Sequence, residues 1–348
     1  MAILTLRNGL QIGSGFAPYI VAEFNSSHNG NVETAKRMID AAKECGCDCV
    51  KMQSWSAESL YAEEYYKSNP IAKRMVAKFS LAEEKLKELA LYCRDCGMDF
   101  SSTPYSKEEV DFLAEQVKVP FLKIASMEID NLPFLQYISS KGLPMVLSTG
   151  MSTMDEIRTA VKAIESAGND QLCILHCVSM YPAEPPAIHL NNMKLLQEEF
   201  PDYPVGYSDH AIGYEVAAAS VALGAAYIEK HFTLDSKKMG MDNNMAAEPE
   251  DMRALVTACH NVYVALGKKQ RKLFRGEWEQ RLKMRRSLVA ARDIAQGEIL
   301  TAADIDVKRP GDGIRPTELD SVVGETAKRD IPKGYLIRRE YLESALDS

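Results

Sequence analysis

Eight short apolar segments in the first two-thirds of the chain each end in polar or ionisable residues. Their length and composition suit strands that are buried on both faces. Eight parallel strands close into a barrel, and the carboxyl ends of barrel strands share one face, where active sites lie. The pattern therefore predicts a barrel with its chemistry at one end, built on residues 20–24, 49–53, 98–102, 121–126, 145–148, 173–177, 205–208 and 227–231.

Segments with the apolar spacing of helices separate these strands. Strands that alternate with helices form a parallel sheet, so the predicted fold class is α/β, a (β/α)8 TIM barrel. Glycines follow four of the helical segments and are expected to adopt the left-handed conformation that ends a helix: Gly46, Gly97, Gly168 and Gly224. The expected helices cover residues 33–45, 81–96, 107–116, 154–167 and 215–223, with a last helix at 249–266.

The composition changes after the predicted barrel. Residues 268–285 are rich in Lys and Arg, and we interpret them as a partly helical linker rather than an anion-binding patch. An internal repeat follows, because Arg292-Asp293-Ile294 recurs as Arg329-Asp330-Ile331. Two such β-turn-β units predict a compact β-rich module. We therefore expect a barrel domain at 1–267, a linker at 268–285 and a small domain at 286–348.

Composition and charge narrow the possible partners. The chain has 348 residues and a formal net charge of −8, which disfavours nucleic-acid binding but still allows a local cationic pocket. Its eight cysteines suit a reducing compartment, and no apolar stretch is long enough to span a bilayer. These features predict a cytoplasmic protein that binds small molecules and neither nucleic acid nor a membrane.

Two histidines are the strongest candidates for chemistry. His210 and His231 stand at the ends of consecutive predicted strands, so their imidazoles are expected to converge. Two histidine ligands would leave most coordination positions of a divalent cation open, as a catalytic metal requires, and Mn²⁺, Fe²⁺, Co²⁺ and Zn²⁺ are all compatible. The alternative is a pair of histidines that only form hydrogen bonds.

Two lysines lie inside apolar strands. Lys51 and Lys123 would be costly to bury unless an anion meets them, which predicts a phosphate or carboxylate site. The alternative is a lysine–glutamate pair, such as Lys123 with Glu128. Hydroxyl groups are expected at the same rim, from Ser102, Thr103, Ser126, Ser148 and Ser208.

Glu23, at the end of the first strand, is the candidate general base or acceptor of a sugar hydroxyl. Tyr181 and Asp242 follow the sixth and eighth strands and are weaker candidates for the same rim.

Ordered motifs occur from about residue 18 onward: Ala22-Glu23 with His28-Asn29-Gly30, Val50-Lys51-Met52-Gln53, Ser102-Thr103-Pro104, Lys123-Ile124-Ala125-Ser126, Ser148-Thr149-Gly150-Met151, His176-Cys177 with Tyr181-Pro182, Gly206-Tyr207-Ser208-Asp209-His210, and Ile228-Glu229-Lys230-His231 continuing to Asp235. Together they resemble the sialic acid synthase (N-acetylneuraminate synthase) family. The repeated C-terminal module, with Lys308-Arg309-Pro310-Gly311, looks like the antifreeze-like (SAF) domain of that family.

The resemblance implies a condensation of phosphoenolpyruvate with an N-acetylated hexosamine to give a nine-carbon 2-keto acid and phosphate. It assigns Glu23 as the acid or base, and His210 and His231 as ligands of a divalent ion, Mn²⁺ first, with Mg²⁺ or Co²⁺ possible. The implied phosphoenolpyruvate-binding residues are Lys51, Thr103, Lys123, Ser126, Ser148 and Ser208. The implied sugar-binding residues are Gln53, Ser179, Tyr181, Asp242 and Arg309.

The resemblance also implies a domain-swapped homodimer, in which the antifreeze-like domain caps the partner's barrel and Arg309 acts on the partner's sugar.

This chain departs from the family pattern on the sugar side. Where the family commonly has Glu-x-Gly-x-Asn-His-Asn-Gly, this chain has Asn25 in place of Gly and Ser27 in place of Asn. Ser179 replaces an Asn, and the segment 241–248 also differs. The reaction type is therefore better specified than the sugar, and precursors of legionaminic or pseudaminic acid stay open.

Two other classes of function compete with this interpretation. One is a metal-dependent TIM-barrel hydrolase acting on a small sugar or amide, but such enzymes commonly carry His-x-His on the first strand, where this chain has only His28. The other is a non-enzymatic carbohydrate-binding or ice-binding scaffold, which would be expected to have lost the rim residues.

Overall fold

The structure is a computed structural model that describes residues 2–343. It divides into two compact units, one up to Gly267 and one from Lys268 onward. By this division the predicted linker, 268–285, falls within the second unit. The small domain was predicted to run to Ser348, and residues 344–348 lie outside the described residues.

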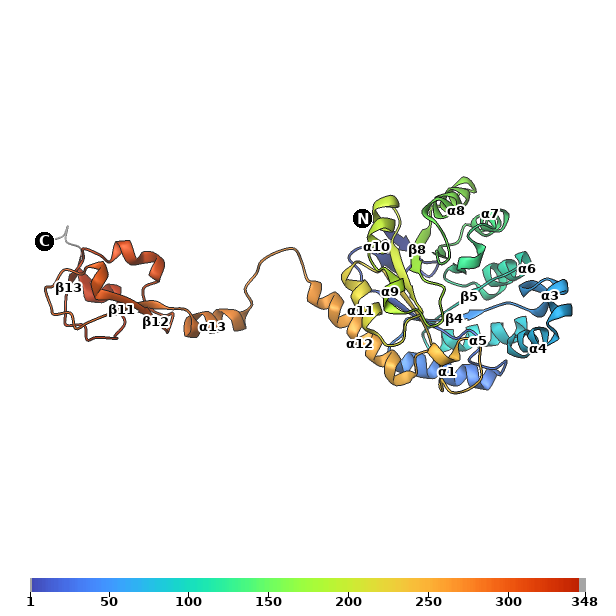
Figure 1. Cartoon of the computed structure of the whole chain (residues 1–348), viewed down its shortest axis with the longest axis horizontal. Helices are drawn as coiled ribbons and strands as arrows, with labels where there is room; N and C mark the ends of the chain where they lie inside the picture. Colours follow the sequence, from blue (N-terminus) through green and yellow to red (C-terminus); the bar gives the residue numbers. More distant parts are fainter. Residues whose placement is uncertain (1, 344–348) are drawn as a thin grey trace. The chain divides into compact units, whose positions relative to one another are not determined.

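The first unit is an eight-stranded parallel barrel, as predicted (Figure 1). The first and last barrel strands pair with each other, with Glu23 opposite His231. The ring runs in the order β5-β4-β3-β10-β9-β8-β7-β6, and Ser101 Oγ joins its two ends by donating a hydrogen bond to the Phe121 carbonyl at 2.9 Å. The strands are β3 (Tyr19–Glu23), β4 (Cys49–Gln53), β5 (Asp99–Thr103), β6 (Leu122–Ile124), β7 (Met145–Ser148), β8 (Leu172–Cys177), β9 (Val205–Asp209) and β10 (Tyr227–His231).

Helices surround the ring of strands (Figure 1). The last, α12, spans Pro249–Leu266, the range expected from the sequence, and all four predicted terminating glycines have positive φ. No helix between residues 2 and 343 is both long and apolar enough to cross a membrane. The remaining helices are α1 (Val32–Cys45), α2 (Ala57–Leu60), α3 (Glu63–Ser68), α4 (Pro70–Phe79), α5 (Glu83–Asp95), α6 (Lys107–Asp111) continued by the π-helical η1 (Phe112–Val117), the 3-10 turn η2 (Ser126–Glu128), α7 (Leu132–Ser139), α8 (Met154–Ser166), α9 (Pro185–Ile188), α10 (Asn192–Glu199), α11 (Glu215–Ala222) and the 3-10 turn η3 (Asn243–Met245).

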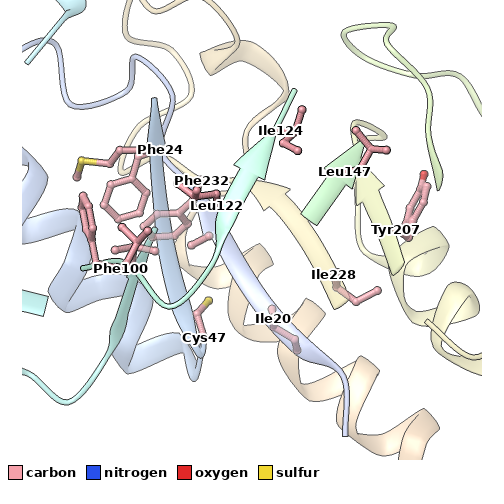
Figure 2. Close-up of a cluster of buried hydrophobic side chains, with 14 of the residues drawn as sticks. Ile20, Phe24, Cys47, Phe100, Leu122, Ile124, Leu147, Tyr207, Ile228 and Phe232 are labelled. Atoms are coloured by element: carbon pink, nitrogen blue, oxygen red, sulfur yellow. The ribbon is translucent and has the colours of Figure 1, made fainter. Parts of the chain in front are cut away.

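Successive residues of each barrel strand face opposite sides. On β10, Ile228 packs outward in the core between strands and helices (Figure 2), whereas Tyr227 packs in the lumen. Side chains alternate across a strand, so Glu229 and His231 share the lumen face with Tyr227. The lumen is apolar near the start of the strands and polar near their ends, and this polarity gradient positions the site.

An N-terminal hairpin that the sequence analysis did not predict closes the amino end of the barrel. Its strands are β1 (Ile3–Thr5) and β2 (Gln11–Gly13). Three of its side chains join the lumen cluster: Leu4, Leu6 and Ile12. The cavity of the barrel therefore has an apolar floor.

The second unit contains a small apolar core between short strands. Its sequence repeat is also a structural one, because Ile294 and Ile331 pair by two backbone hydrogen bonds of 3.0 and 2.8 Å. Its elements are α13 (Arg275–Met284), β11 (Ser287–Ala290), η4 (Ala302–Asp304), β12 (Ile305–Lys308), η5 (Pro316–Ser321), β13 (Thr326–Ala327), η6 (Arg339–Tyr341) and β14 (Leu342–Glu343).

Candidate functional site

A cavity of about 470 Å³ opens at the carboxyl ends of the barrel strands. Except for Ser102, which was wrongly predicted at this rim, the candidate site residues predicted in the barrel line the cavity, so the structure brings them together on one face. These residues are Glu23, Lys51, Gln53, Thr103, Lys123, Ser126, Ser148, Ser179, Tyr181, Ser208, His210, His231 and Asp242.

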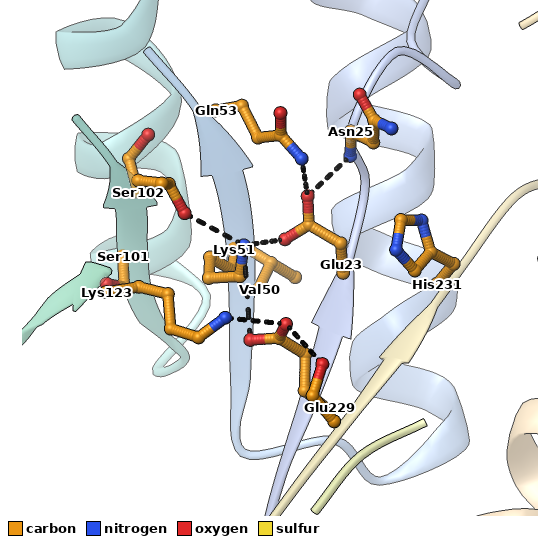
Figure 3. A network of polar contacts seen from close by, with 12 residues as sticks. Glu23, Asn25, Val50, Lys51, Gln53, Ser101, Ser102, Lys123, Glu229 and His231 are labelled. Carbon is orange, nitrogen blue, oxygen red and sulfur yellow. Dashed lines mark hydrogen bonds and ion pairs between the residues drawn. The ribbon is translucent and has the colours of Figure 1, made fainter. Parts of the chain in front are cut away.

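Two lysines and two glutamates form a buried network low in this cavity (Figure 3). Lys51 Nζ forms an ion pair with Glu23 and lies 3.9 Å from Glu229 Oε2. Lys123 Nζ lies 2.9 Å from Glu229 Oε1. All four side chains are buried, and a buried charge requires such a partner.

The network shifts the pKa values of its two carboxyl groups in opposite directions. Burial raises the pKa of Glu23, although Lys51 opposes this shift. Burial also disfavours the charged form of Glu229, but Lys123 and Lys51 outweigh it and lower the pKa of Glu229 to about 2. Glu229 is therefore the fixed negative charge, and Glu23 is the carboxyl group better suited to exchange a proton.

Sequence reasoning missed the role of Glu229 and named the wrong carboxylate as the alternative partner of Lys123. Glu128 instead accepts a hydrogen bond from Asn131 Nδ2 at 2.8 Å. Residue alternation could have identified Glu229, because it lies two positions before His231 and so shares the lumen face.

The hydroxyl groups surround the lysines. Thr103 Oγ1 accepts from Lys51 Nζ at 3.1 Å, and Ser208 Oγ donates to Glu229 at 3.2 Å. Ser148 Oγ and Ser179 Oγ are buried and have no hydrogen-bond partner within residues 2–343. Hydroxyls without partners at a cavity wall are suited to a polar ligand.

Two neighbouring positions differ in their relation to this part of the wall. Ser102 does not belong to it, because it faces away from the cavity and bonds Ser54 Oγ at 2.6 Å. Gly150 leaves room for the hydroxyl groups, since a Cβ atom there would lie 2.3 Å from Ser179 Oγ and 2.8 Å from Ser126 Oγ.

His210 and His231 face each other with ring centroids 5.3 Å apart. The His210 Nδ1–H is oriented by the Val178 carbonyl at 2.8 Å, an arrangement that leaves Nε2 free. Burial and the nearby His210 hold the pKa of His231 well below its usual range, so its ring stays neutral. A neutral imidazole with a free nitrogen, as in His231, fits a divalent cation. Burial opposes protonation of His210, but Cys177 outweighs it and raises the pKa of His210, so this ring holds a proton more readily than His231.

The other ligands of such a cation would come mostly from water or substrate. Among the described residues, no three His, Cys, Asp or Glu side chains are arranged to hold a metal ion. An Asp242 carboxylate oxygen lies 3.8 Å from His231 Nδ1, at the edge of this pair.

The upper wall of the cavity carries the predicted sugar-binding side chains. Gln53 Nε2 donates to Glu23 Oε1 at 3.0 Å. Trp55 Nε1 and Tyr105 OH each donate to Gln53 Oε1 at 2.8 Å, and sequence reasoning had identified neither residue. The Tyr181 ring lies 4.4 Å from the His210 ring. Gln53 is thus held in one orientation over Glu23.

Arg309 is the predicted site residue that lies in the second unit. It follows β12 directly and is exposed.

Comparison with known proteins relates this geometry to a family. Residues 38–271 match the NeuB family, and residues 285–343 match the SAF domain. The chain is 36% identical over 345 residues to an N,N'-diacetyllegionaminic acid synthase from Legionella pneumophila, covering 95% of this chain and 96% of the relative. It is 32% identical over 350 residues to the Homo sapiens N-acetylneuraminate-9-phosphate synthase, with 98% and 97% covered.

A solved structure of the N-acetylneuraminic acid (sialic acid) synthetase from Leptospira borgpetersenii has the same architecture. It superposes with a TM-score of 0.73 at 31% identity, covering 80% of this chain and 94% of that chain.

Proposed function

The chain belongs to the NeuB family of sialic acid synthase-like enzymes, and on this basis we propose that it condenses phosphoenolpyruvate with an N-acetylated hexosamine. The resemblance predicted from the sequence motifs is confirmed. Members of this family are phosphoenolpyruvate-condensing transferases that make nine-carbon 2-keto acids, so the hydrolase alternative is set aside.

In the proposed reaction, the third carbon of phosphoenolpyruvate bonds to the aldehyde carbon of the open-chain sugar. Water adds to the second carbon, and inorganic phosphate leaves as the 2-keto group forms. The proposed sugar is N-acetylmannosamine or a related 2,4-diacetamido sugar. The product is then N-acetylneuraminate or an acid of the legionaminate or pseudaminate type.

The lower cavity is the proposed phosphoenolpyruvate site. Lys51 and Lys123 provide two buried cations near one another, and the phosphate and carboxylate of the substrate are suited to both. Ser148 Oγ, which lacks a partner among residues 2–343, would donate to one of these anionic groups. Thr103, Ser126 and Ser208 complete the proposed set.

The upper cavity is the proposed sugar site. Glu23 stands between the two halves, and its raised pKa suits a group that passes a proton to or from the aldehyde oxygen. Gln53, Ser179, Tyr181 and Asp242 are the proposed contacts to the sugar, and Ser179 Oγ is without a partner in the described residues.

His210 and His231 are the proposed metal ligands, and Mn²⁺ is the proposed ion. Members of this family generally use a divalent metal. A divalent cation bound there would supply positive charge that polarises the aldehyde oxygen. The Val178 carbonyl orients the His210 ring for that purpose.

We also propose a cytoplasmic homodimer in which Arg309 of one chain reaches the sugar of the other. Large apolar side chains are exposed in the segments that follow the barrel strands, which is typical of a surface that another protein covers. They are Met127, Met151, Met180, Ile212 and Met239.

The observation that carries the proposal is the convergence of two buried lysines, a glutamate of raised pKa and two facing histidines in one cavity. With Mn²⁺ present, the protein should release phosphate from phosphoenolpyruvate only when a suitable N-acetylhexosamine is supplied. A phosphate assay across a panel of such sugars, with mass spectrometry of the product, tests this. Phosphate release without sugar, or none with the whole panel, would overturn the proposal.

A further inference from the structure

The turn after β3 carries a side chain at a backbone position that favours glycine. Asn25 has φ of 39°, in the left-handed region. Non-glycine residues are strained in this conformation, and asparagine tolerates it better than most. Asn25 is only 5% exposed and lines the cavity. A side chain kept in such a position is a reason to search for a role.

Only one of the two polar atoms of the Asn25 amide forms a hydrogen bond. Its Nδ2 donates to Asp242 Oδ2. Its Oδ1 is buried and has no hydrogen-bond partner among residues 2–343. The reversed orientation would set two acceptors against each other, because the carboxylate can only accept. A buried acceptor without a partner destabilises the folded chain unless a ligand satisfies it.

Neighbouring contacts fix this turn against the loop that follows β10. Ser26 Oγ accepts a hydrogen bond from the Met241 backbone N–H at 2.7 Å. Ser27 Oγ donates to Asn243 Oδ1 at 2.5 Å. The turn after β3 and the loop after β10 therefore contact each other, and they hold the Asn25 amide in place.

The chemistry of the two substrates decides which of them could satisfy Asn25. Phosphate and carboxylate oxygens dominate phosphoenolpyruvate, and when ionised they only accept hydrogen bonds. The amino sugar carries donors, in its acetamido N–H and its hydroxyl groups. An unpartnered acceptor beside Asp242 thus matches the second substrate.

We propose that Asn25 is a specificity-determining residue for the amino sugar. Its Oδ1 accepts a hydrogen bond from an acetamido N–H or a hydroxyl of the sugar, while its Nδ2 holds Asp242 against the same substrate. This inference rests on the proposed function.

The test is Asn25→Gly, with steady-state kinetics for both substrates and a thermal melt. The KM for the sugar should rise roughly 3- to 10-fold, since one hydrogen bond of ordinary strength is lost. The KM for phosphoenolpyruvate should stay within about twofold. The melting temperature should not fall, because glycine relieves the backbone strain. A merely structural role for Asn25 predicts instead a lower melting temperature and similar changes for both substrates.

Asn29→Gly is the matched control. Asn29 also has a left-handed backbone, with φ of 52°, but it does not line the cavity. This variant should gain the same relief of strain with no change in the KM for the sugar. A one-acetamido hexosamine and a 2,4-diacetamido sugar are compared in both variants. The ratio of their kcat/KM values should change in Asn25→Gly alone.

A second variant changes the amide without removing the side chain. Asn25→Asp keeps the size and turn preference of the side chain but places a carboxylate against Asp242, so the KM for the sugar should rise further. An unchanged KM and sugar ratio in both Asn25 variants would overturn the inference while phosphate release by the wild type upholds the proposed function. No phosphate release by the wild type with any sugar would overturn the proposed function and the inference with it.

Discussion

Glu229 remains charged although its side chain is buried in the cavity wall. Its folded pKa of about 2 is below the usual value, so its charge stabilises the fold at pH values above about 4.5. That stabilisation is lost as the pH falls from about 4.5 to about 2. Glu229→Gln should lower the free energy of unfolding at pH 7 by roughly 3 kcal/mol and flatten its decline across this pH range. Urea unfolding at a series of pH values measures both effects.

Glu198→Gln is a suitable control, because Glu198 is exposed on α10. It should change neither the free energy of unfolding at pH 7 nor its pH dependence by more than about 0.5 kcal/mol. Equal pH profiles for wild type and Glu229→Gln would contradict the assignment of Glu229 as the fixed charge.

Some candidate residues could be found from the sequence because they break an apolar strand, whereas Ser179 and Arg309 were found only through the family resemblance. Lys51, Lys123 and His231 are conspicuous for that reason, and the structure places all three in one cavity. Trp55 and Tyr105 could not be found in this way, because they lie in segments whose path no periodic pattern predicts. Their role depends on a shared contact with Gln53, and only the folded chain shows it.

At the scale of elements, β9 and β10 are joined by a second buried ion pair on their outward face. Lys230 Nζ lies 2.8 Å from Asp209 Oδ2 and also bonds the Ala211 carbonyl. Both charged side chains are at most 1% exposed. Each precedes a proposed metal ligand in the sequence, so the pair ties the two strands together directly behind the histidines.

Removing one partner of this pair should cost more than removing both. Lys230→Met leaves the buried Asp209 carboxylate without a cation, although Tyr207 OH and the Ala211 N–H still donate to it, and should lower the free energy of unfolding by about 3–5 kcal/mol. Asp209→Asn combined with Lys230→Met removes the charge but keeps an oxygen that accepts from Tyr207 OH and the Ala211 N–H, and should recover a large part of that loss. Urea unfolding of the single and double variants measures the difference.

Arg158→Met, in an exposed ion pair with Glu199 on the barrel surface, is the comparison variant and should cost at most about 1 kcal/mol. A double variant less stable than Lys230→Met would contradict the expected coupling.

Apolar runs predicted the barrel strands well, because a strand buried on both faces is apolar throughout. The N-terminal hairpin escaped this reasoning. Its strands are three residues long and contain polar residues such as Thr5 and Gln11, which face outward. The sequence pattern of so short a strand cannot be distinguished from that of a loop. The hairpin is buried only because it packs on side chains of barrel strands that lie far away in the sequence.

At the scale of the whole molecule, the proposed dimer builds each active site from Glu23 of one chain and Arg309 of the other chain. If each active site takes Arg309 from the partner, Arg309→Ala and Glu23→Ala homodimers should both be nearly inactive. Mixing the two variants under conditions that exchange subunits should restore up to about a quarter of the wild-type activity, because one site in each heterodimer is intact. A phosphate-release assay before and after mixing measures the recovery.

The control is each variant taken alone through the same subunit-exchange conditions, and it should stay inactive. If heterodimers form, as shown by differently tagged chains that co-purify, and activity does not recover, then Arg309 does not act across the dimer.

The hairpin at the amino end bears on the order in which the chain can assemble. Leu4 and Leu6 pack on lumen side chains that include Phe121 and Tyr227. The surface that receives them does not exist until the last barrel strand has been made and the ring has closed. Residues that are made before every barrel strand are therefore among the last to find their contacts, and their apolar side chains stay exposed until the final barrel strand has been made.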